Sequence, residues 1–342
     1  MITISLCMIV KNEERVLKRC LDSVRDLVDE IIIVDTGSTD ATKRIAAGYT
    51  DKIYDFTWID DFSAARNFAF SKATKEYIYS ADADEVLSEE NRRRFRLLKE
   101  TLFPEIEIVQ MKYGNQLQNG TVYNFDEEYR PKLFRRLRSF VWEEPIHETV
   151  RLEPVVYDRD IVITHMPEQN HAGRDLANFR KQIAQGRRFS RRLYGMYARE
   201  LFLAGEAQDF LEAENYFRAE VSSPDRSADE ITEGCCVAAR AARLRGAAVT
   251  FFKYTSKAIT GDGCSEICCE LGHFYEETGD FEEAAVWYYN AAYETQPVLA
   301  LRSSEEEPLQ GLIRCYEQLG LPAQVRSYAE ELKHRQNEKT DN

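Results

Sequence analysis

The feature that most constrains the fold is an alternation of short apolar runs and amphipathic segments over about the first 85 residues. The apolar runs are rich in Ile and Val, and they lie at residues 3–10, 30–34, 52–56 and 76–80. Between them, apolar residues recur at helical spacing in segments 16–28 and 62–73. Buried strands that alternate with helices in this way are typical of an α/β domain with a mostly parallel, doubly wound sheet.

The rest of the chain follows two other patterns. Shorter runs, which indicate strands with more antiparallel pairing, lie at residues 105–112, 121–125, 131–137, 151–157 and 161–165. From about residue 174 the pattern is helical almost throughout. We therefore expect an α/β domain in residues 1–170, a helical linker in 171–195 and an all-α domain in 196–340.

The helical part contains an internal repeat. Residues 209–217 align with residues 280–288 after a shift of 71, and an Asp-Phe pair, an alanine and an aromatic residue coincide. This shift is about twice the roughly 35-residue unit of tetratricopeptide repeats. In such a unit the small residues let paired helices approach, and the aromatic residues fill the gaps. An unrelated helical bundle is the alternative.

Charge and composition exclude several classes of protein. The 342 residues carry a net charge of −14, and residues 196–342 hold 14 Lys and Arg against 27 Asp and Glu. This acidity argues against a nucleic-acid partner, whereas the nearly neutral N-terminal part can bind an anionic ligand. Apolar runs of the roughly 18–20 residues that span a bilayer are absent, as is a basic leader. We expect no integral membrane segment and a cytoplasmic protein.

Eight cysteines without paired C-x-x-C motifs favour reduced, buried thiols over a disulfide framework. A zinc site formed by Cys264, Cys268 and His273 is a minor alternative.

Acidic residues follow two of the expected strands. Asp35 ends the second run, and Asp82-Ala83-Asp84 follows the fourth. In open α/β sheets, ligands bind beyond the carboxyl ends of the strands. Two aspartates at this spacing can bind Mn²⁺ or Mg²⁺, and such an ion can neutralise a diphosphate. The alternatives are that Asp35 only shapes a turn and that the two aspartates belong to a solvated loop.

These motifs together resemble a known family. Residues 7–14, 33–40 and 81–85 are similar to family-2 glycosyltransferases, which have the GT-A fold. Trp58, residues 62–67, and Trp142 followed by His147-Glu148 resemble the bacterial subgroup that often carries tetratricopeptide repeats after the catalytic domain. The resemblance covers nearly the whole chain.

The resemblance implies a donor site and a metal site. The nucleotide-sugar site would contain Ile9, Val10, Lys11, Asp35, Arg66, Asn67, Asp82 and Ala83. Asp35 would bind a uracil-type base, and Arg66 would contact the phosphates. The metal, Mn²⁺ or Mg²⁺, would be bound by Asp84, Asp82 and His165. A capping or core histidine is the alternative for His165.

The family inverts the configuration at the anomeric carbon, so an acceptor-side carboxylate must act as base. Glu148 occupies the position that the resemblance favours, and Glu144 and Glu143 are competitors. His147 would orient the base or bind a phosphate oxygen. This subgroup more often has glycine in place of Glu144, so a different base stays open.

A basic cluster lies shortly before this motif. It comprises Arg130, Lys132, Arg135, Arg136 and Arg138. The cluster either holds an anionic acceptor or has a structural role on a strand, because apolar residues alternate with it.

The resulting functional hypothesis is an inverting, metal-dependent glycosyltransferase. It would move a hexose or N-acetylhexosamine from a UDP-sugar to a hydroxyl or thiol. A peptide acceptor is slightly favoured over a cell-surface glycan, and the repeat domain is a candidate surface for a homodimer. The alternative is a non-catalytic repeat scaffold whose first domain only senses a sugar nucleotide.

Overall fold

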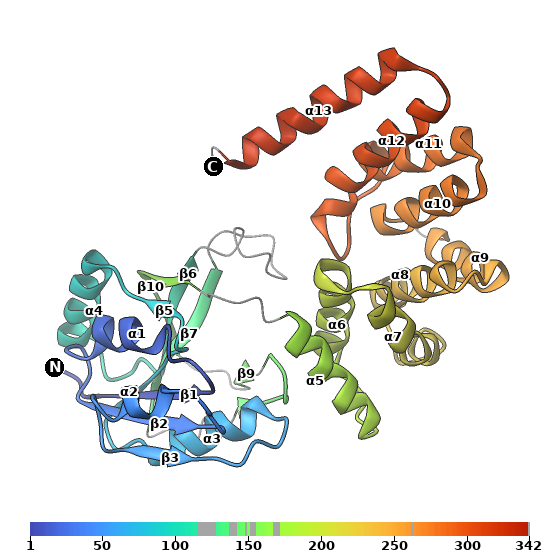
Figure 1. Cartoon of the computed structure of the whole chain (residues 1–342). Helices are drawn as coiled ribbons and strands as arrows, with labels where there is room; N and C mark the ends of the chain where they lie inside the picture. Colours follow the sequence, from blue (N-terminus) through green and yellow to red (C-terminus); the bar gives the residue numbers. More distant parts are fainter. Residues whose placement is uncertain are drawn as a thin grey trace. The chain divides into compact units, whose positions relative to one another are not determined.

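The computed structural model describes residues 1–114, 128–136, 142–147, 149–150, 155–166, 172–260 and 263–340. The chain divides into two compact units, Met1–His171 and Ala172–Asn342. Figure 1 shows a sheet with helices in the first unit and an array of helices in the second. The architecture confirms the expected fold class, an α/β domain followed by an all-α region. The segment expected to be a helical linker, 171–195, contains helix α5 and the beginning of α6, and all of it but residue 171 falls in the second unit.

The first unit contains one large sheet. Its strands are β1 (Ile4–Val10), β2 (Glu30–Asp35), β3 (Ile53–Asp55), β4 (Tyr77–Ser80), β5 (Glu85–Val86), β6 (Ile108–Gly114), β7 (Glu128–Arg135) and β10 (Val156–His165). Their order in space is β3-β2-β1-β4-β7-β6-β10-β5. Two short strands, β8 (Trp142–Glu143) and β9 (Thr149–Val150), pair with each other.

Strand direction divides the sheet into two parts. The pairs β3–β2, β2–β1 and β1–β4 are parallel, and β7 is antiparallel to both β4 and β6. The run expected at 161–165 and the end of the run expected at 151–157 belong to one strand, β10, which is parallel to β6. Residues 151–154 lie outside the described residues. A register shift between Arg159 and Val162 interrupts the pairing and explains why the sequence reads as two strands. The strand expected at 121–125 lies outside the described residues.

Helices cover both faces of this sheet, as the doubly wound prediction requires. They are α1 (Leu17–Val24), α2 (Thr42–Ala46), α3 (Phe62–Lys72) and α4 (Glu89–Thr101). Alternate residues of β1, such as Leu6 and Met8, share a core with α1 and α4. Cys7 lies on the opposite face, in a core with α3 and Trp142. The strand period of two residues therefore gives the sheet two separate cores.

The second unit is built from helices. They are α5 (Ala172–Ala184), α6 (Arg191–Ala204), α7 (Ala207–Glu220), α8 (Ala228–Leu244), α9 (Ala248–Ile259), α10 (Ser265–Thr278), α11 (Phe281–Tyr289), α12 (Glu306–Gln318) and α13 (Pro322–Thr340). A five-residue π-helix, Asn290–Glu294, extends α11, and a 3-10 turn, Leu301–Ser303, precedes α12. From α7 to α13, most consecutive helices pack against each other, and α8 also contacts α10.

Small and aromatic residues pack these helices as the repeat pattern predicts. Tyr288 of α11 is fully buried. A Cβ atom on Gly272 of α10 would lie 2.7 Å from its ring, and one on Gly311 of α12 would lie 2.5 Å from it. Both neighbouring helices therefore need glycine at the point where they face this ring.

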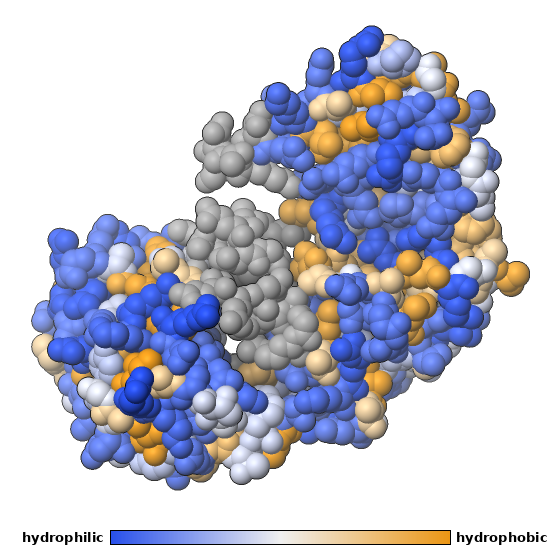
Figure 2. Space-filling model, in the orientation of Figure 1, coloured by the Kyte–Doolittle hydropathy of each residue, from blue (hydrophilic) through white to orange (hydrophobic). Residues whose placement is uncertain are grey.

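The surface and the cysteines agree with the composition. On the face shown in Figure 2, hydrophilic residues predominate on both units, and apolar residues form scattered groups. Among the described residues, no helix is both long and apolar enough to cross a membrane. All eight cysteines are buried and free.

Substituting Gly311→Ala tests the packing around Tyr288. The new methyl group would overlap a buried ring, so we expect the free energy of unfolding to fall by about 1–3 kcal/mol. Gly195→Ala in α6 is the matched control, because its Cβ would meet only the flexible end of Glu233, at 3.0 Å. Denaturant unfolding should show no loss for this control, since alanine favours a helix by about 1 kcal/mol. Equal losses for both variants would contradict the account.

Burial of Glu200 in α6 predicts a pH effect. Burial, and then the charge of Asp175, raises the pKa of Glu200 from 4.5 to about 7. Its contribution to stability is therefore present below pH 4.5 and is lost as the pH rises through about 7. Above that pH, Glu200→Gln should be more stable than the wild type by up to about 3 kcal/mol, and at pH 4.5 the two should be alike. Denaturant unfolding at both pH values checks this, and a pH-independent difference would contradict it.

Candidate functional site

The candidate site lies where three parallel strands end. Val10 at the end of β1 pairs with Asp35 at the end of β2, and Cys7 pairs with Ser80 at the end of β4. The carboxyl ends of β2, β1 and β4 therefore meet at one edge of the sheet, which is where ligands bind in open α/β folds. Of the residues at this edge that were expected to bind the nucleotide, Val10 is buried at the end of β1, and Lys11, which follows it, is exposed.

Asp35 combines a structural role with an unused acceptor. Its Oδ1 atom accepts hydrogen bonds from the backbone N–H groups of Gly37, at 3.0 Å, and Ser38, at 2.9 Å. Its Oδ2 atom is buried and has no hydrogen-bond partner among the described residues. A buried acceptor without a donor is unfavourable, so this atom is suited to a donor brought by a ligand.

The loops around Asp35 fix each other. Asn12, which follows β1, has a φ of 58°, and its side-chain oxygen accepts a hydrogen bond from Thr39 at 2.8 Å. The N–H of Asn12 donates to Ser38, and the N–H of Glu13 donates to Thr42 at 2.7 Å. These hydrogen bonds therefore hold the β1–α1 and β2–α2 loops together beside the Asp35 carboxylate.

Arg66 of α3 links the end of β4 to the aspartate motif. It donates to the Ser80 hydroxyl at 3.0 Å and to Asp82 Oδ1 at 2.8 Å. Its guanidinium lies 5.1 Å from the centre of the Trp142 ring. The Arg66 side chain is 12% exposed and that of Asp82 is 39% exposed, so the pair borders solvent and can reach a ligand.

Asp82 and Asp84 lie in the turn between β4 and β5. Ala83, between them, is buried in the core, while both aspartates are half-buried. The N–H of Met166 donates to the carbonyl of Asp84 at 3.0 Å, and His165 pairs with Glu85 in the β10–β5 ladder. The backbone of His165 is therefore next to this turn, whereas its side chain lies outside the described set. The two carboxylates of this turn fit a Mn²⁺ or Mg²⁺ site.

A buried ion pair lies beside the same turn. Glu85, the residue after Asp84, is 2% exposed and pairs with Lys132 of β7. Burial raises the pKa of Glu85 to about 7, against the opposing effect of the Lys132 charge. Because Lys132 is buried and paired with Glu85, it is not free to bind an anionic acceptor substrate. Of the two roles considered for the basic cluster, Lys132 therefore has the structural one.

The segment that carries the candidate bases is tied to α3. Asn67 donates to the Trp142 carbonyl at 3.0 Å and accepts from the Trp142 N–H at 2.8 Å. The N–H of Phe62 donates to the Pro145 carbonyl at 2.9 Å. Both polar atoms of Asn67, expected to bind the nucleotide, are therefore already bonded to the backbone of β8.

The candidate bases themselves are only partly described. Glu144 and His147 are half-buried and have φ values of 69° and 48°. Glu148 and the side chain of Glu143 lie outside the described residues. Left-handed backbone at non-glycine residues is unfavourable and clusters at functional sites. The remaining non-glycine residues with positive φ that the structure describes are Asn12 and Asp60, which also follow strands β1 and β3.

Comparisons with known proteins identify the first unit. Residues 5–151 match the model of the family named Glycosyl transferase family 2. The first unit contains a family 2 glycosyltransferase domain. This finding confirms the family to which the sequence motifs are similar.

Relatives and solved structures are similar to parts of the chain. The SPbeta prophage-derived glycosyltransferase SunS of Bacillus subtilis is 34% identical over 165 residues, which are 46% of this chain and 36% of the relative. A TPR repeat-containing protein of Synechococcus elongatus is 53% identical over 87 residues, which are 25% of this chain and 22% of the relative. The matches thus span about a third or less of these curated relatives.

Among solved structures, glucosyl-3-phosphoglycerate synthase from Mycobacterium tuberculosis, in complex with Mn²⁺, UDP and phosphoglyceric acid, has a TM-score of 0.40. It is 16% identical and covers 49% of this chain and 72% of its own.

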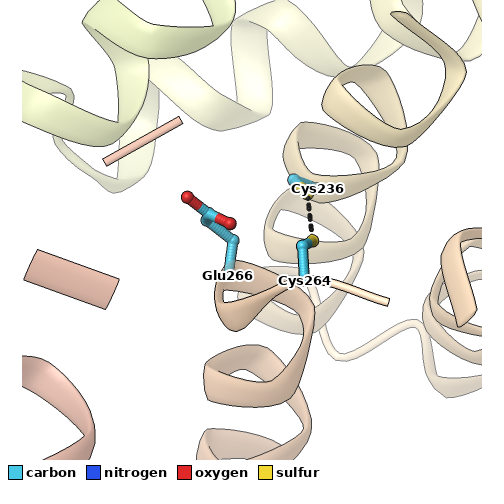
Figure 3. Close-up of side chains that lie close together, drawn as sticks. All are labelled: Cys236, Cys264 and Glu266. Atoms are coloured by element: carbon cyan, nitrogen blue, oxygen red, sulfur yellow. Dashed lines mark hydrogen bonds between the residues drawn. The ribbon is translucent and has the colours of Figure 1, made fainter. Parts of the chain in front are cut away.

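A second group of metal-type ligands lies outside the glycosyltransferase domain. Cys236, Cys264 and Glu266 are buried together, and the two sulfur atoms are 3.5 Å apart (Figure 3). Glu266 accepts hydrogen bonds from three backbone N–H groups, of Val298, Leu299 and Ala300. Its carboxylate therefore already caps this segment, and the group is a packed part of the helical core.

The zinc trio considered from the sequence is not brought together. Neither Cys268 nor His273 belongs to the described group of potential ligands. His273 instead bonds to Tyr288, at 2.7 Å, and to Glu307, at 3.0 Å, and these contacts direct it into a separate polar network.

The second unit also contains a cavity of about 500 Å³, which shares no residue with the glycosyltransferase domain. It is lined by Ile259, Gly263, Cys268, Trp287, Tyr289, Asn290, Glu294 and Thr295. Burial raises the pKa of Cys268 to about 11, which keeps this thiol protonated and unreactive near neutral pH.

Sequence reasoning did not assign the contacts of three residues that hold the site. The Ser80 hydroxyl accepts a hydrogen bond from Arg66, and the Trp142 ring lies near the same guanidinium. Lys132 forms an ion pair with Glu85. Lys132 is buried, and a lysine is rarely buried without an acidic partner, but the sequence alone does not show this burial. The partner could not be identified, since Glu85 and Lys132 are 47 residues apart.

Asn67→Ala separates a structural role from a nucleotide-binding role. The change removes both hydrogen bonds to Trp142, so the free energy of unfolding should fall by about 1–3 kcal/mol. Affinity for UDP, measured by calorimetry, should stay within about threefold of the wild type. A large loss of UDP affinity at unchanged stability would show that Asn67 contacts the nucleotide.

Proposed function

We propose that this protein is a metal-dependent glycosyltransferase that uses a UDP-sugar. The observation that supports this most directly is the arrangement at the edge of the sheet. Asp35, with its unused Oδ2 atom, ends β2, and Asp82 and Asp84 follow β4 in the same parallel part of the sheet. Arg66 of α3 bonds to Asp82. A nucleoside diphosphate needs such groups in this combination: an acceptor for its base, and cations with carboxylates for its phosphates.

The nucleotide would be bound at both of its ends. The N3–H of uracil can donate to Asp35 Oδ2, which is buried at the end of β2. Lys11, exposed at the end of β1, supplies a positive charge near the same edge. Arg66 already holds Asp82, and its planar guanidinium suits a phosphate oxygen as well.

Asp82 and Asp84 would hold the divalent cation, with His165 as a third ligand. Oxygen ligands with one imidazole suit Mn²⁺, and two carboxylates alone suit Mg²⁺. When bound, the cation supplies charge neutralisation for the departing diphosphate.

The transfer would invert the configuration at the anomeric carbon of the donor sugar. An acceptor hydroxyl or thiol attacks this carbon as its bond to the diphosphate oxygen breaks. The proton passes from the acceptor to a carboxylate, with Glu148 as the first candidate and Glu144 as the second. His147, adjacent to Glu148, would orient that base. The β8–β9 segment is suitably anchored, because Asn67 bonds to both backbone groups of Trp142.

The acceptor is a peptide side chain in this proposal, and the sugar is a hexose or N-acetylhexosamine. Residues 196–342 carry a net charge of −13, which favours a basic peptide over an anionic glycan. Stacked helices present extended surfaces on which a peptide can lie.

Asp84→Ala tests the proposed chemistry. Release of sugar from a panel of UDP- and GDP-sugars should be fastest with one UDP-sugar, and the variant should lose at least about 100-fold in turnover. The variant should remain folded by circular dichroism, because Asp84 is half-buried at a turn.

Asp51→Ala is the matched control, since Asp51 is an exposed carboxylate that precedes β3 in the same unit. Turnover of Asp84→Ala close to that of the control would contradict the metal assignment. Binding of a UDP-sugar with neither hydrolysis nor transfer would instead favour the sensing scaffold.

A further inference from the structure

We propose that Lys132 is a positioning residue for the divalent cation: through Glu85, it holds the turn that carries Asp82 and Asp84. The inference rests on the proposed function, because it concerns the same metal site. Lys132 would not touch the metal or the substrate.

The side chain of Glu85 anchors the turn from one side. Glu85 directly follows Asp84, and its carboxylate pairs with Lys132 on the central antiparallel strand β7. The side chains of Lys132 and Glu85 are only 8% and 2% exposed. Lys132 also lies 5.1 Å from the centre of the Tyr113 ring, so its ammonium is held between a carboxylate and an aromatic face.

The backbone anchors the same turn from the other side. Glu85 pairs with His165 of β10, and Asp84 accepts a hydrogen bond from Met166 at 3.0 Å. Glu85 is therefore the residue through which the aspartate turn, strand β7 and the strand that carries His165 are joined. Movement of Glu85 would therefore displace the turn that carries Asp82 and Asp84.

The ion pair is poorly explained by stability alone. Buried ion pairs are often no more stable than apolar residues of the same shape. Here Glu85 Oε2 is buried without a hydrogen-bond partner among the described residues, which makes the pair less favourable still. A pair that is imperfect for stability but adjacent to the proposed ligands is consistent with a positional role.

The concentration of negative charge at this turn also supports a positioning role for Lys132. Asp82, Asp84 and Glu85 place three carboxylates within four residues. Lys132 pairs with Glu85, so the carboxylate next to Asp84 has a counter-charge that reduces repulsion within this group. Residues that orient metal ligands in this indirect way typically change metal affinity by about 10- to 100-fold when they are replaced.

The test is the affinity for Mn²⁺ in the presence of UDP, measured by electron paramagnetic resonance. Lys132→Met removes the ammonium and keeps the length of the side chain. Glu85→Asp keeps both charges and shortens the reach. Each should raise the Kd for Mn²⁺ by about tenfold or more. The double variant Lys132→Met with Glu85→Gln removes the pair without leaving a buried charge, and it keeps the assay informative if Lys132→Met does not fold.

Glu30→Gln is the matched control. Glu30 begins β2, at the opposite edge of the same sheet, and its side chain is also 2% exposed and paired with a lysine, Lys52. Its loss should lower the melting temperature but leave the Kd for Mn²⁺ within about twofold.

The double variant distinguishes a role of the ion pair in positioning the metal ligands from a role in stability alone. We expect its melting temperature to recover relative to Lys132→Met while its Mn²⁺ affinity stays low. Recovery of both quantities, or wild-type affinity in Lys132→Met or Glu85→Asp, would overturn the inference. If the wild type binds no Mn²⁺ with UDP, the proposed function itself fails, and that result is distinct from a failure confined to the variants.

Discussion

The parallel pairing of β1 with β2 and β4 is the constraint on which the rest of the first unit depends. It brings Asp35, at the end of one strand, to the same edge as Ser80 and the aspartate turn that follows another. Each group then has its own anchor: backbone N–H groups for Asp35 and Arg66 for Asp82. A slip of one residue in this register would turn the core side chains of β1 to the other face.

Much of this architecture was predictable because strand and helix periods are local properties. The four runs before residue 85 become β1 to β4, and Asp35 and the aspartate turn lie at their ends as expected. The course of β10 was not predictable in this way. Its bulge between Arg159 and Val162 divides one strand into two apparent runs, and its pairing with β6 is a long-range contact.

The site was predictable as a set of motifs, but not as a network. Arg66 and Asn67 are adjacent in the sequence, yet one bonds to Asp82 and the other to Trp142. The buried partner of Glu85 is a lysine on a distant strand, and single-sequence patterns contain no signal for such a pair. In the second unit, the pattern of small and aromatic residues did predict close helix packing, and Gly272 and Gly311 contact the Tyr288 ring in this way.

A crystal structure with Mn²⁺ and UDP is the most direct test of the central claim, that one edge of the sheet binds both the base and the metal. The account predicts uracil N3 within about 3 Å of Asp35 Oδ2, and the metal bound by Asp84 with Asp82 beside it. A nucleotide bound elsewhere on the chain, or a metal bound away from both aspartates, would contradict it.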